Sequence, residues 1–320
     1  MKTARFHKTF FLGALTICAA LFGASACAQD NSKRIALTYD DAPRGNGPFF
    51  TGEERTAEFI AALERADLEQ AAIFVTTQNL KTDADRDRIA AYAAAGHVIA
   101  NHSHTHPWAN RTDVADYIAD IDKAEALLEG FENRRSWFRF PFLDEGRERG
   151  KRDALREALA ERDLLSGYVT VDTYDWHMEA LVQRAVRDGY CVNREALGEV
   201  YVDMFVDAAE HYHAMALETL GRAPAQVLLL HENDVGAMFA DDLVAGLRDA
   251  GWEIITADEA YADPLAVQLP DTTFSGKGRI AAFAKEADLP NNRIDHPASD
   301  EAPIAVRFAV AQAFHECEAE

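Results

Sequence analysis

Short apolar runs alternate with longer amphipathic segments along most of the chain. The apolar runs are rich in β-branched or aromatic residues, which is typical of buried strands, whereas the segments between them repeat at the helical period. The expected strands are residues 34–39, 71–76, 97–101, 137–140, 167–171, 226–230 and 252–256. The clearest expected helices are residues 52–68, 83–96, 112–130 and 151–164. Strands that alternate with helices predict a parallel sheet, and seven such units favour a barrel, complete or incomplete.

The pattern changes in two places. Residues 193–220 form an unusually long helical stretch before the sixth strand. From about residue 263 the strand pattern stops, and residues 274–289 and 302–314 have apolar faces at helical spacing. The sequence therefore predicts a barrel domain over residues 29–262 and a helical C-terminal extension over residues 263–320 that packs on it.

The first residues have the order of a targeting signal. Three basic residues within the first eight precede an uncharged apolar run at residues 10–22, and small residues follow. This order predicts a secretory signal peptide over residues 1–28 and not a membrane span. The mature protein is then periplasmic or secreted, with no transmembrane segment after cleavage. Cleavage two residues earlier would leave Cys27 at the N-terminus, where it could carry a lipid anchor, and both possibilities stay open.

The charge of the chain is strongly negative. It has 54 acidic and 32 basic residues, a formal net charge of −22. The first 26 residues contain three of the basic residues and no acidic one, so the chain from Cys27 onward has a net charge of −25. Such a charge repels phosphate backbones, which disfavours nucleic acid as a partner.

Cysteines give little support for a metal or redox site. The sequence has no CxxC pair, so neither a cysteine zinc site nor a thioredoxin-like site is indicated. In an oxidising compartment Cys191 and Cys317 could form a disulfide, and the sequence leaves that question open.

Potentially reactive residues follow most of the expected strands. In parallel barrels the working residues come from the loops just after the strands, so residues at these points can meet at one edge. The residues concerned are Asp40, Asp41, His102, His106, Arg139, Asp172, Asp175 and His231. We expect them to share a site.

The stretch "NHSHTHP" contains three alternating histidines. His102 and His106 have the spacing of neighbours on a helical turn, and a chain that turns after Asn101 places these two on one side and His104 elsewhere. With one aspartate, two histidines leave open coordination positions, as a catalytic metal requires. The residues alone also allow another interpretation, in which the aspartates cap a turn and the histidines lie in a solvated loop.

Five motifs make the pattern specific. "TYDD", "NHSHTHP", "RFPF", "DTYDW" and "LLLH" occur in the order and approximate spacing of the five motifs of the polysaccharide deacetylases, so the chain resembles this family of carbohydrate esterases over about residues 34–260. The resemblance implies an incomplete (β/α)7-type barrel. It also implies metal-dependent hydrolysis of N-acetyl, sometimes O-acetyl, groups on an acetylated oligo- or polysaccharide.

The same resemblance implies roles for individual residues. Asp40 matches the general base and Arg139 the residue that orients it, while His231 matches the general acid and Asp175 the carboxylate that tunes it. The implied metal ligands are Asp41, His102 and His106, with Zn²⁺ the most common ion and another divalent metal possible. The residues that match oxyanion or substrate contacts are Phe142, through its backbone N–H and ring, Pro141 and Trp176.

The chain departs from the family pattern after its aspartate pair. Ala42 replaces the usual glycine, and the following loop "PRGNGPFF" is longer than usual. The glycan of this protein therefore cannot be taken over from the family. Only the acidic composition favours one class, neutral or cationic glycans. Glu232 and Asp234 could act as the acids of a glycosidase, which is disfavoured because His231 already has a role.

Two functions of other classes remain as alternatives. One is a non-catalytic glycan-binding relative with the same fold, which acetate release from acetylated sugars would exclude. The other is a non-haem iron oxygenase, because two histidines and one carboxylate also form the iron facial triad. Metal analysis combined with an oxygen-consumption assay would separate that enzyme from a deacetylase.

Overall fold

The computed structural model describes residues 31–317. Within them, seven parallel strands form one curled sheet in the order β5-β4-β3-β2-β1-β7, and β8 also pairs with β1. The strands are β1 (Arg34–Ala42), β2 (Ala72–Val75), β3 (Val98–Asn101), β4 (Arg134–Phe138), β5 (Leu165–Ser166), β7 (Gln226–His231) and β8 (Glu253–Ile254). The predicted signal peptide and the alternative lipid anchor at Cys27 lie outside the described residues.

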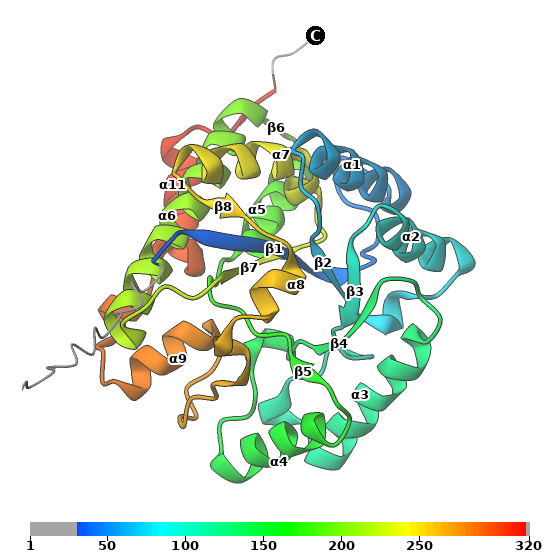
Figure 1. Ribbon diagram of the computed structural model, residues 1–320. Helices are drawn as coiled ribbons and strands as arrows, with labels where there is room; N and C mark the ends of the chain where they lie inside the picture. The colour runs from blue at the N-terminus through cyan, green and yellow to red at the C-terminus, as the bar shows by residue number, and fades with distance from the viewer. Residues whose placement is uncertain (1–30, 318–320) are drawn as a thin grey trace, which may run out of the picture.

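Helices surround the sheet (Figure 1). Those that belong to the barrel are α1 (Gly52–Arg65), α2 (Asp83–Ala94), α3 (Val114–Leu128), α4 (Arg149–Ala160), α5 (Asp175–Arg187), α6 (Arg194–Leu220), α7 (Asp234–Asp249) and α8 (Ala257–Tyr261). Short 3₁₀ helices lie at Thr77–Asn79, Ala109–Arg111, Pro141–Leu143, Pro264–Val267 and Pro297–Ser299. No helix within residues 31–317 combines the length and apolar character that crossing a membrane requires.

Several helices begin where the sequence places a good capping residue. Thr51 accepts a hydrogen bond from the backbone N–H of Glu54, whose side chain accepts one from Thr51 in return, and Thr82 begins α2 in the same way with Asp85. Such reciprocal capping satisfies N–H groups that the first helical turn leaves without partners. The long helix α6 ends at Gly221, which adopts the left-handed conformation with φ 70°.

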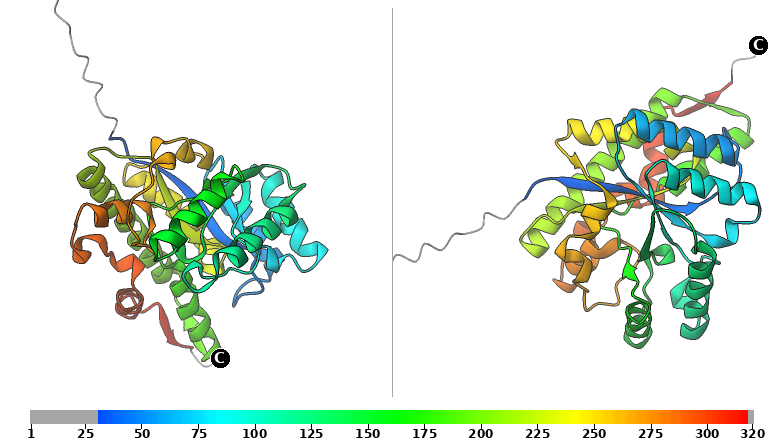
Figure 2. Two further views of the ribbon diagram at one scale, coloured as in Figure 1. Left: turned by 90° about the horizontal axis from the view of Figure 1, so that it is seen from below. Right: turned by 45° about the vertical axis from the view of Figure 1, so that its right-hand side comes forward.

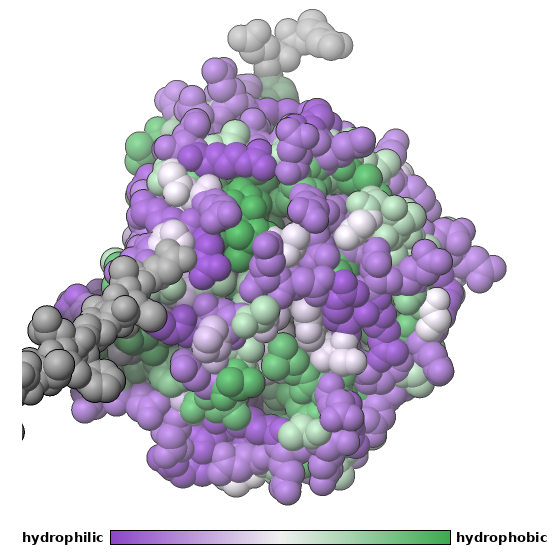
Figure 3. Space-filling model, viewed as in Figure 1, coloured by the Kyte–Doolittle hydropathy of each residue, from purple (hydrophilic) through white to green (hydrophobic). Residues whose placement is uncertain are grey.

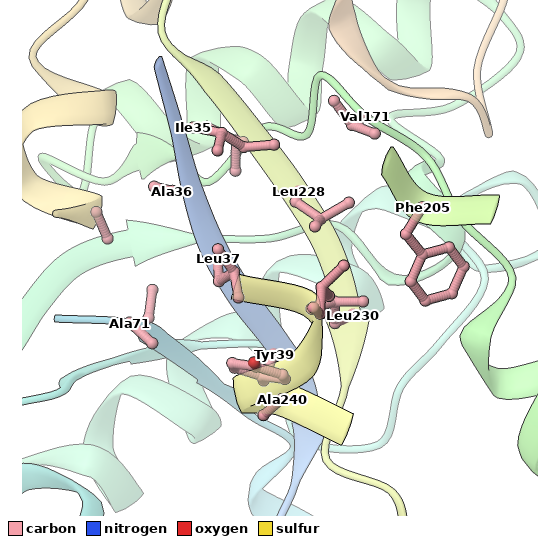
Figure 4. Packing of buried hydrophobic residues seen from close by; sticks show 14 of the residues in the cluster. Ile35, Ala36, Leu37, Tyr39, Ala71, Val171, Phe205, Leu228, Leu230 and Ala240 are labelled. Atoms are coloured by element: carbon pink, nitrogen blue, oxygen red, sulfur yellow. The ribbon is translucent and has the colours of Figure 1, made fainter. Parts of the chain in front are cut away.

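The core lies where β1 and β7 run side by side. Figure 4 shows Ile35 and Leu37 of β1 beside Leu228 and Leu230 of β7, with Phe205 of α6 on one side. All five side chains are fully buried. Strands covered on both faces read as continuous apolar runs, which is why the sequence pattern identified them.

The expected strand at residues 167–171 is not continuous. Residues 165 and 166 pair with β4, whereas Val171 forms an isolated bridge to Leu228 of β7. Between these points the carbonyl oxygen of Gly167 accepts a hydrogen bond from the Arg139 guanidinium at 2.7 Å and not from a strand. The segment therefore crosses from one edge of the sheet to the other and nearly closes the ring, which makes the barrel incomplete.

The C-terminal segment packs on the barrel, as its apolar faces predict. It contains α9 (Gly278–Glu286), α10 (Asn291–Ile294) and α11 (Glu301–Val310), and these helices lie against α5 and α6 (Figure 2). It is not wholly helical, because β9 (Phe314–Glu316) pairs antiparallel with β6 (Tyr190–Val192). The surface of one face is mostly hydrophilic, with apolar areas of limited extent (Figure 3).

A disulfide joins the two strands of this small sheet. Cys191 lies in β6, and Cys317 follows β9 directly. The bond ties the C-terminal segment to the chain 126 residues earlier, which restricts the unfolded chain. The sequence had left this pairing open.

We expect reduction of this disulfide to lower the free energy of unfolding by about 2–4 kcal/mol. Denaturant titrations with and without a thiol reductant measure the difference. In the double variant Cys191→Ser/Cys317→Ser, reductant should have no further effect. Equal stability of the oxidised and reduced wild-type protein would contradict this expectation.

Candidate active site

The carboxyl ends of the strands open into a cleft of about 680 Å³. Asp40 of β1 and His231 of β7 are partners in the sheet register, so the two residues lie side by side at this edge. The charged or titratable lining residues are Asp40, Asp41, Arg44, His102, His106, Arg147, Asp172 and His231. The aromatic lining residues are Trp108, Phe142, Tyr174 and Trp176. The structure brings six of the eight residues that the sequence indicated to the lining of this cleft, and Arg139 and Asp175 are not among its lining residues.

Asp41, His102 and His106 form a compact group. Oδ1 of Asp41 lies 3.7 Å from Nε2 of His102 and 3.4 Å from Nε2 of His106, and one ligand atom from each residue lies within 4.8 Å of the others. Nδ1 of His102 lies 3.0 Å from the carbonyl oxygen of Arg139, which fixes the proton on Nδ1 and leaves Nε2 with a lone pair that can bind a metal. One carboxylate and two imidazoles arranged in this way fit a divalent metal such as Zn²⁺.

The protonation states of this group also suit a metal. Burial alone would raise the pKa of Asp41, but the nearby His231, His106, His102 and Arg44 hold it well below its usual range. Burial, together with the charge of His102, lowers the pKa of His106 to about 4. An ionised carboxylate and a neutral imidazole are the forms that bind metals.

The histidine loop reaches this geometry without a helical turn. β3 ends at Asn101, and Ser103 and His106 then adopt left-handed conformations with φ 71° and 55°. The Asn101 side chain accepts from the N–H of Ser103 at 2.6 Å, and the Ser103 hydroxyl accepts from the N–H of His106 at 3.0 Å. No helical turn forms, but the chain does turn after Asn101 and places His102 and His106 on one side, with both Nε2 atoms beside Asp41.

His104 points away from the group, as predicted. Its Nδ1 lies 2.9 Å from the hydroxyl of Thr77, and its backbone N–H donates to Asp120 at 2.7 Å. We therefore expect His106→Ala to remove most of the bound metal, whereas His104→Ala should leave the metal content nearly unchanged. Metal analysis of the two purified proteins makes the comparison. Equal losses would mean that all three histidines are ligands.

Asp40 and Arg139 form a buried ion pair. Nη1 of Arg139 donates to Oδ1 of Asp40 at 2.7 Å, and Nη2 donates to the hydroxyl of Tyr261 at 2.7 Å. Oδ2 of Asp40 lies on the other side, 3.6 Å from Nε2 of His102. The guanidinium therefore occupies one carboxylate oxygen and leaves the second facing the metal-binding group.

A bulge separates the two adjacent aspartates. The register of β1 against β2 shifts between Tyr39 and Ala42, and Asp41 has φ 71°. Neighbouring side chains of a regular strand point to opposite faces. Here the irregular backbone lets both carboxylates line the same cleft while they contact different partners.

His231 and Asp175 form the second pair. Asp175 is fully buried at the start of α5, and its Oδ1 lies 2.6 Å from Nδ1 of His231. Its Oδ2 accepts from the backbone N–H of His231 at 2.7 Å and from the side chain of Asn233 at 3.0 Å. Burial alone would lower the pKa of His231, but the charge and hydrogen bond of Asp175 raise it to about 9.

Aromatic rings form the walls of the cleft. Phe142 is 49% exposed and packs against His106 at a centroid distance of 4.6 Å and against Trp108 at 5.0 Å. Its φ of 57° places its backbone in the left-handed region. Trp176 packs against Tyr174 at 5.0 Å. Pro141 is buried and is not among the lining residues, so the structure does not bring it into the cleft.

A comparison with known protein families finds a match over part of the chain. Residues 28–159 match the family model described as polysaccharide deacetylase.

This part of the chain is therefore similar to the polysaccharide deacetylases.

Two curated relatives of the chain carry deacetylase names. It is 25% identical over 228 residues to a peptidoglycan-N-acetylglucosamine deacetylase of Bacillus cereus, a match that covers 70% of this chain and 68% of the relative. It is 30% identical over 115 residues to a chitin deacetylase of Colletotrichum lindemuthianum, covering 34% and 42% of the two chains. A solved pseudoenzyme of family CE4 from Bacillus anthracis is 18% identical with a TM-score of 0.46, covering 72% of this chain and 66% of that one.

The family model covers only part of the cleft. The matched segment supplies Asp40, the three residues of the metal-binding group, Arg139 and Phe142, whereas Asp175, Trp176 and His231 lie beyond it. Sequence reasoning missed Arg44, Trp108 and Arg147 as cleft residues. Trp108 directly follows the histidine motif, and this position could have indicated that it lines the cleft. Nothing in the sequence indicated which arginines do so.

Proposed function

We propose that this protein is an exported, metal-dependent hydrolase that removes N-acetyl, or O-acetyl, groups from a carbohydrate. One observation carries the proposal. A carboxylate held by an arginine, a histidine held by a carboxylate, and a group able to bind a metal all line one cleft. Acetyl transfer to water needs a base, an acid and stabilisation of negative charge, and these residues can supply all three.

Asp41, His102 and His106 would hold the ion. A divalent metal bound there lowers the pKa of water and polarises the acetyl carbonyl. Asp40 is placed to accept the proton of the attacking water through Oδ2, because Arg139 already occupies Oδ1. We assign the backbone N–H of Phe142 to the oxygen that becomes negatively charged when water adds to the carbonyl carbon.

The second half of the reaction needs a proton donor. Asp175 holds Nδ1 of His231, so Nε2 is the nitrogen left to act in the cleft. When the bond between the acetyl carbon and the sugar nitrogen breaks, Nε2–H donates its proton to that nitrogen, and the products are acetate and a free amine. Trp176 and Phe142 are placed to contact the sugar and the acetyl group, whereas buried Pro141 would act by supporting the turn that carries Phe142.

Acetate release tests the proposal directly. The purified protein is incubated with chitin oligosaccharides, peptidoglycan fragments, acetylated xylan and an acetylated exopolysaccharide, in the presence of a divalent metal. We expect acetate from at least one of them and none after chelation, with recovery on addition of metal. Glycan binding without acetate release from any substrate would instead indicate the non-catalytic relative.

Export rests on the N-terminal sequence pattern alone. We expect the protein isolated from its native cell to begin near Cys27 or Gln29, as N-terminal sequencing would show. A lipid on Cys27 would decide between the two cleavage sites. An intact Met1 on the cellular protein would exclude the signal peptide.

A further inference from the structure

Two arginines line the cleft of this acidic protein. Arg44 and Arg147 both line it, although the chain as a whole has a net charge of −22. We infer that these two arginines recognise a carboxylate on the substrate, so that the glycan carries an anionic sugar or substituent next to the acetyl group that is removed. The inference rests on the proposed function and narrows its substrate class.

Arg44 is held in place by buried charges. Its backbone N–H donates to Glu232 at 2.6 Å, and its carbonyl oxygen accepts from Arg55 at 2.7 Å and from Arg88 at 2.9 Å. Three charged side chains, each at most 6% exposed, thus fix the backbone of one residue in the loop after β1. This loop directly follows the aspartate pair, and these buried contacts hold its position.

The same ion-pair network includes Glu232 and Asp234, the two acids considered above for a glycosidase. Glu232 pairs with Arg88 at 2.9 Å, and Asp234 pairs with Arg55 at 2.8 Å. Oδ2 of Asp234 also accepts from the backbone N–H of Phe49 at 2.8 Å. Buried ion pairs contribute little net stability, because both ions lose their hydration. They do impose a single geometry on the loop, and both acids are fully engaged there, which leaves neither for glycosidase chemistry.

The guanidinium groups of Arg44 and Arg147 have no close ion pair with a carboxylate in the described part of the chain. The nearest carboxylate to Arg44 is that of Asp41, with 3.8 Å between Nη1 and Oδ2, and Asp41 belongs to the metal-binding group. Within residues 31–317, Arg147 has no ion pair, and its recorded contact is the ring of Trp108 at 5.7 Å. Both arginines can therefore offer their planar N–H groups to a ligand, and a carboxylate matches that geometry.

Two of the three acids that line the cleft, Asp40 and Asp172, oppose this positive charge only weakly. Asp40 is neutralised by Arg139, with a separation of 2.7 Å. Asp172 is buried, and that burial raises its pKa to about 7, so it is largely uncharged in mildly acidic solution. The third acid, Asp41, is ionised but belongs to the metal-binding group, where a bound divalent ion would offset its charge. The cleft is therefore less negative than the molecule as a whole, and a cleft concentrates the field of the charges that line it. The expectation of a neutral or cationic glycan was based only on the net charge of the chain.

The test compares binding of three oligosaccharides of equal length. One is a neutral chitin oligosaccharide, one alternates N-acetylglucosamine with glucuronate, and one contains N-acetylmuramate, whose carboxylate is on the acetylated sugar itself. Calorimetry gives the Kd of each at low salt. We expect at least one carboxylate-bearing ligand to bind about tenfold or more tightly than the neutral one. That preference should shrink as salt rises, because exposed charges are then screened.

Substitutions test whether the two cleft arginines cause the preference for anionic ligands. Arg44→Gln and Arg147→Gln should each reduce the ratio of neutral to anionic Kd by about threefold or more, because the two residues share the preference. Arg111→Gln is the matched control, because its guanidinium lies 4.1 Å from the same Trp108 ring but does not line the cleft. It should leave the ratio unchanged.

Two results would overturn the inference. One is equal or weaker binding of both anionic ligands by the wild-type protein. The other is an effect of Arg111→Gln as large as that of the two cleft variants. Acetate release from the same oligosaccharides judges the proposed function separately, because the Kd ratio does not depend on turnover. The better of the two anionic ligands shows where the carboxylate lies relative to the acetyl group.

Discussion

Asp40→Asn should lower turnover by about 10²-fold or more and leave the metal content unchanged. Asparagine keeps an oxygen that can accept from Arg139, so the buried pair at 2.7 Å can persist as a neutral-acceptor hydrogen bond. The amide cannot take a proton from water at neutral pH. Steady-state acetate release and metal analysis on the same preparation measure the two effects.

Asp41→Asn is the matched control for this variant. It makes the same chemical change one residue along the chain, but Asp41 lies 3.4 Å from Nε2 of His106 in the metal-binding group. We expect weaker metal affinity, with part of the activity restored by excess metal. If Asp40→Asn lost its metal and Asp41→Asn kept it, the two roles would be reversed. Full activity in both variants would exclude the mechanism.

His231 should limit activity on the alkaline side. Its pKa of about 9 means that the ring stays protonated up to that pH, and kcat/KM should fall as pH rises through about 9. Asp175→Asn removes the charge that raises this pKa, so the alkaline limb should move to lower pH and kcat should fall by about 10²-fold. A pH profile of wild type and variant measures both shifts. An unchanged alkaline limb in Asp175→Asn would show that His231 is not the group that titrates.

The same pair affects folding. Because the folded-state pKa of His231 lies above its ordinary value of 6.5, the folded protein binds this proton more tightly than the unfolded chain does. The stability from the pair is therefore complete below about pH 6.5 and is lost as pH rises towards 9. Asp175→Asn should flatten that part of the stability profile.

Much of the barrel and half of the cleft could be predicted from the sequence, because both depend on local patterns. Apolar runs covered on two faces identify strands, and the residue that ends a parallel strand reaches the active edge whatever its exact register. Asp40 and His231 illustrate this, since they are partners in the register of β1 and β7. The prediction of strands fails where one segment passes from one strand to another. Residues 167–171 read as a strand, but the residues that pair with β4 are 165 and 166, and Val171 forms only an isolated bridge to β7.

Features that depend on distant side chains could not be predicted. The loop that carries Arg44 is fixed by Glu232 and Arg88, which lie far away in the chain. Net charge averages over the whole surface, so it could not indicate that Arg44 and Arg147 line the cleft. The disulfide between Cys191 and Cys317 depends on strands that only the folded C-terminal segment brings together.

The backbone at the cleft limits how this protein can be stabilised. Asp41, Ser103, His106 and Phe142 all have left-handed φ values between 55° and 71°. Each such residue is less favourable by roughly 1–2 kcal/mol than in an ordinary conformation, while a whole domain is stable by only about 5–15 kcal/mol. A selection for heat resistance would therefore favour substitutions that relax these four positions, and such substitutions would dismantle the cleft. Thermostable variants of this protein should be sought in the outer helices and screened for retained acetate release.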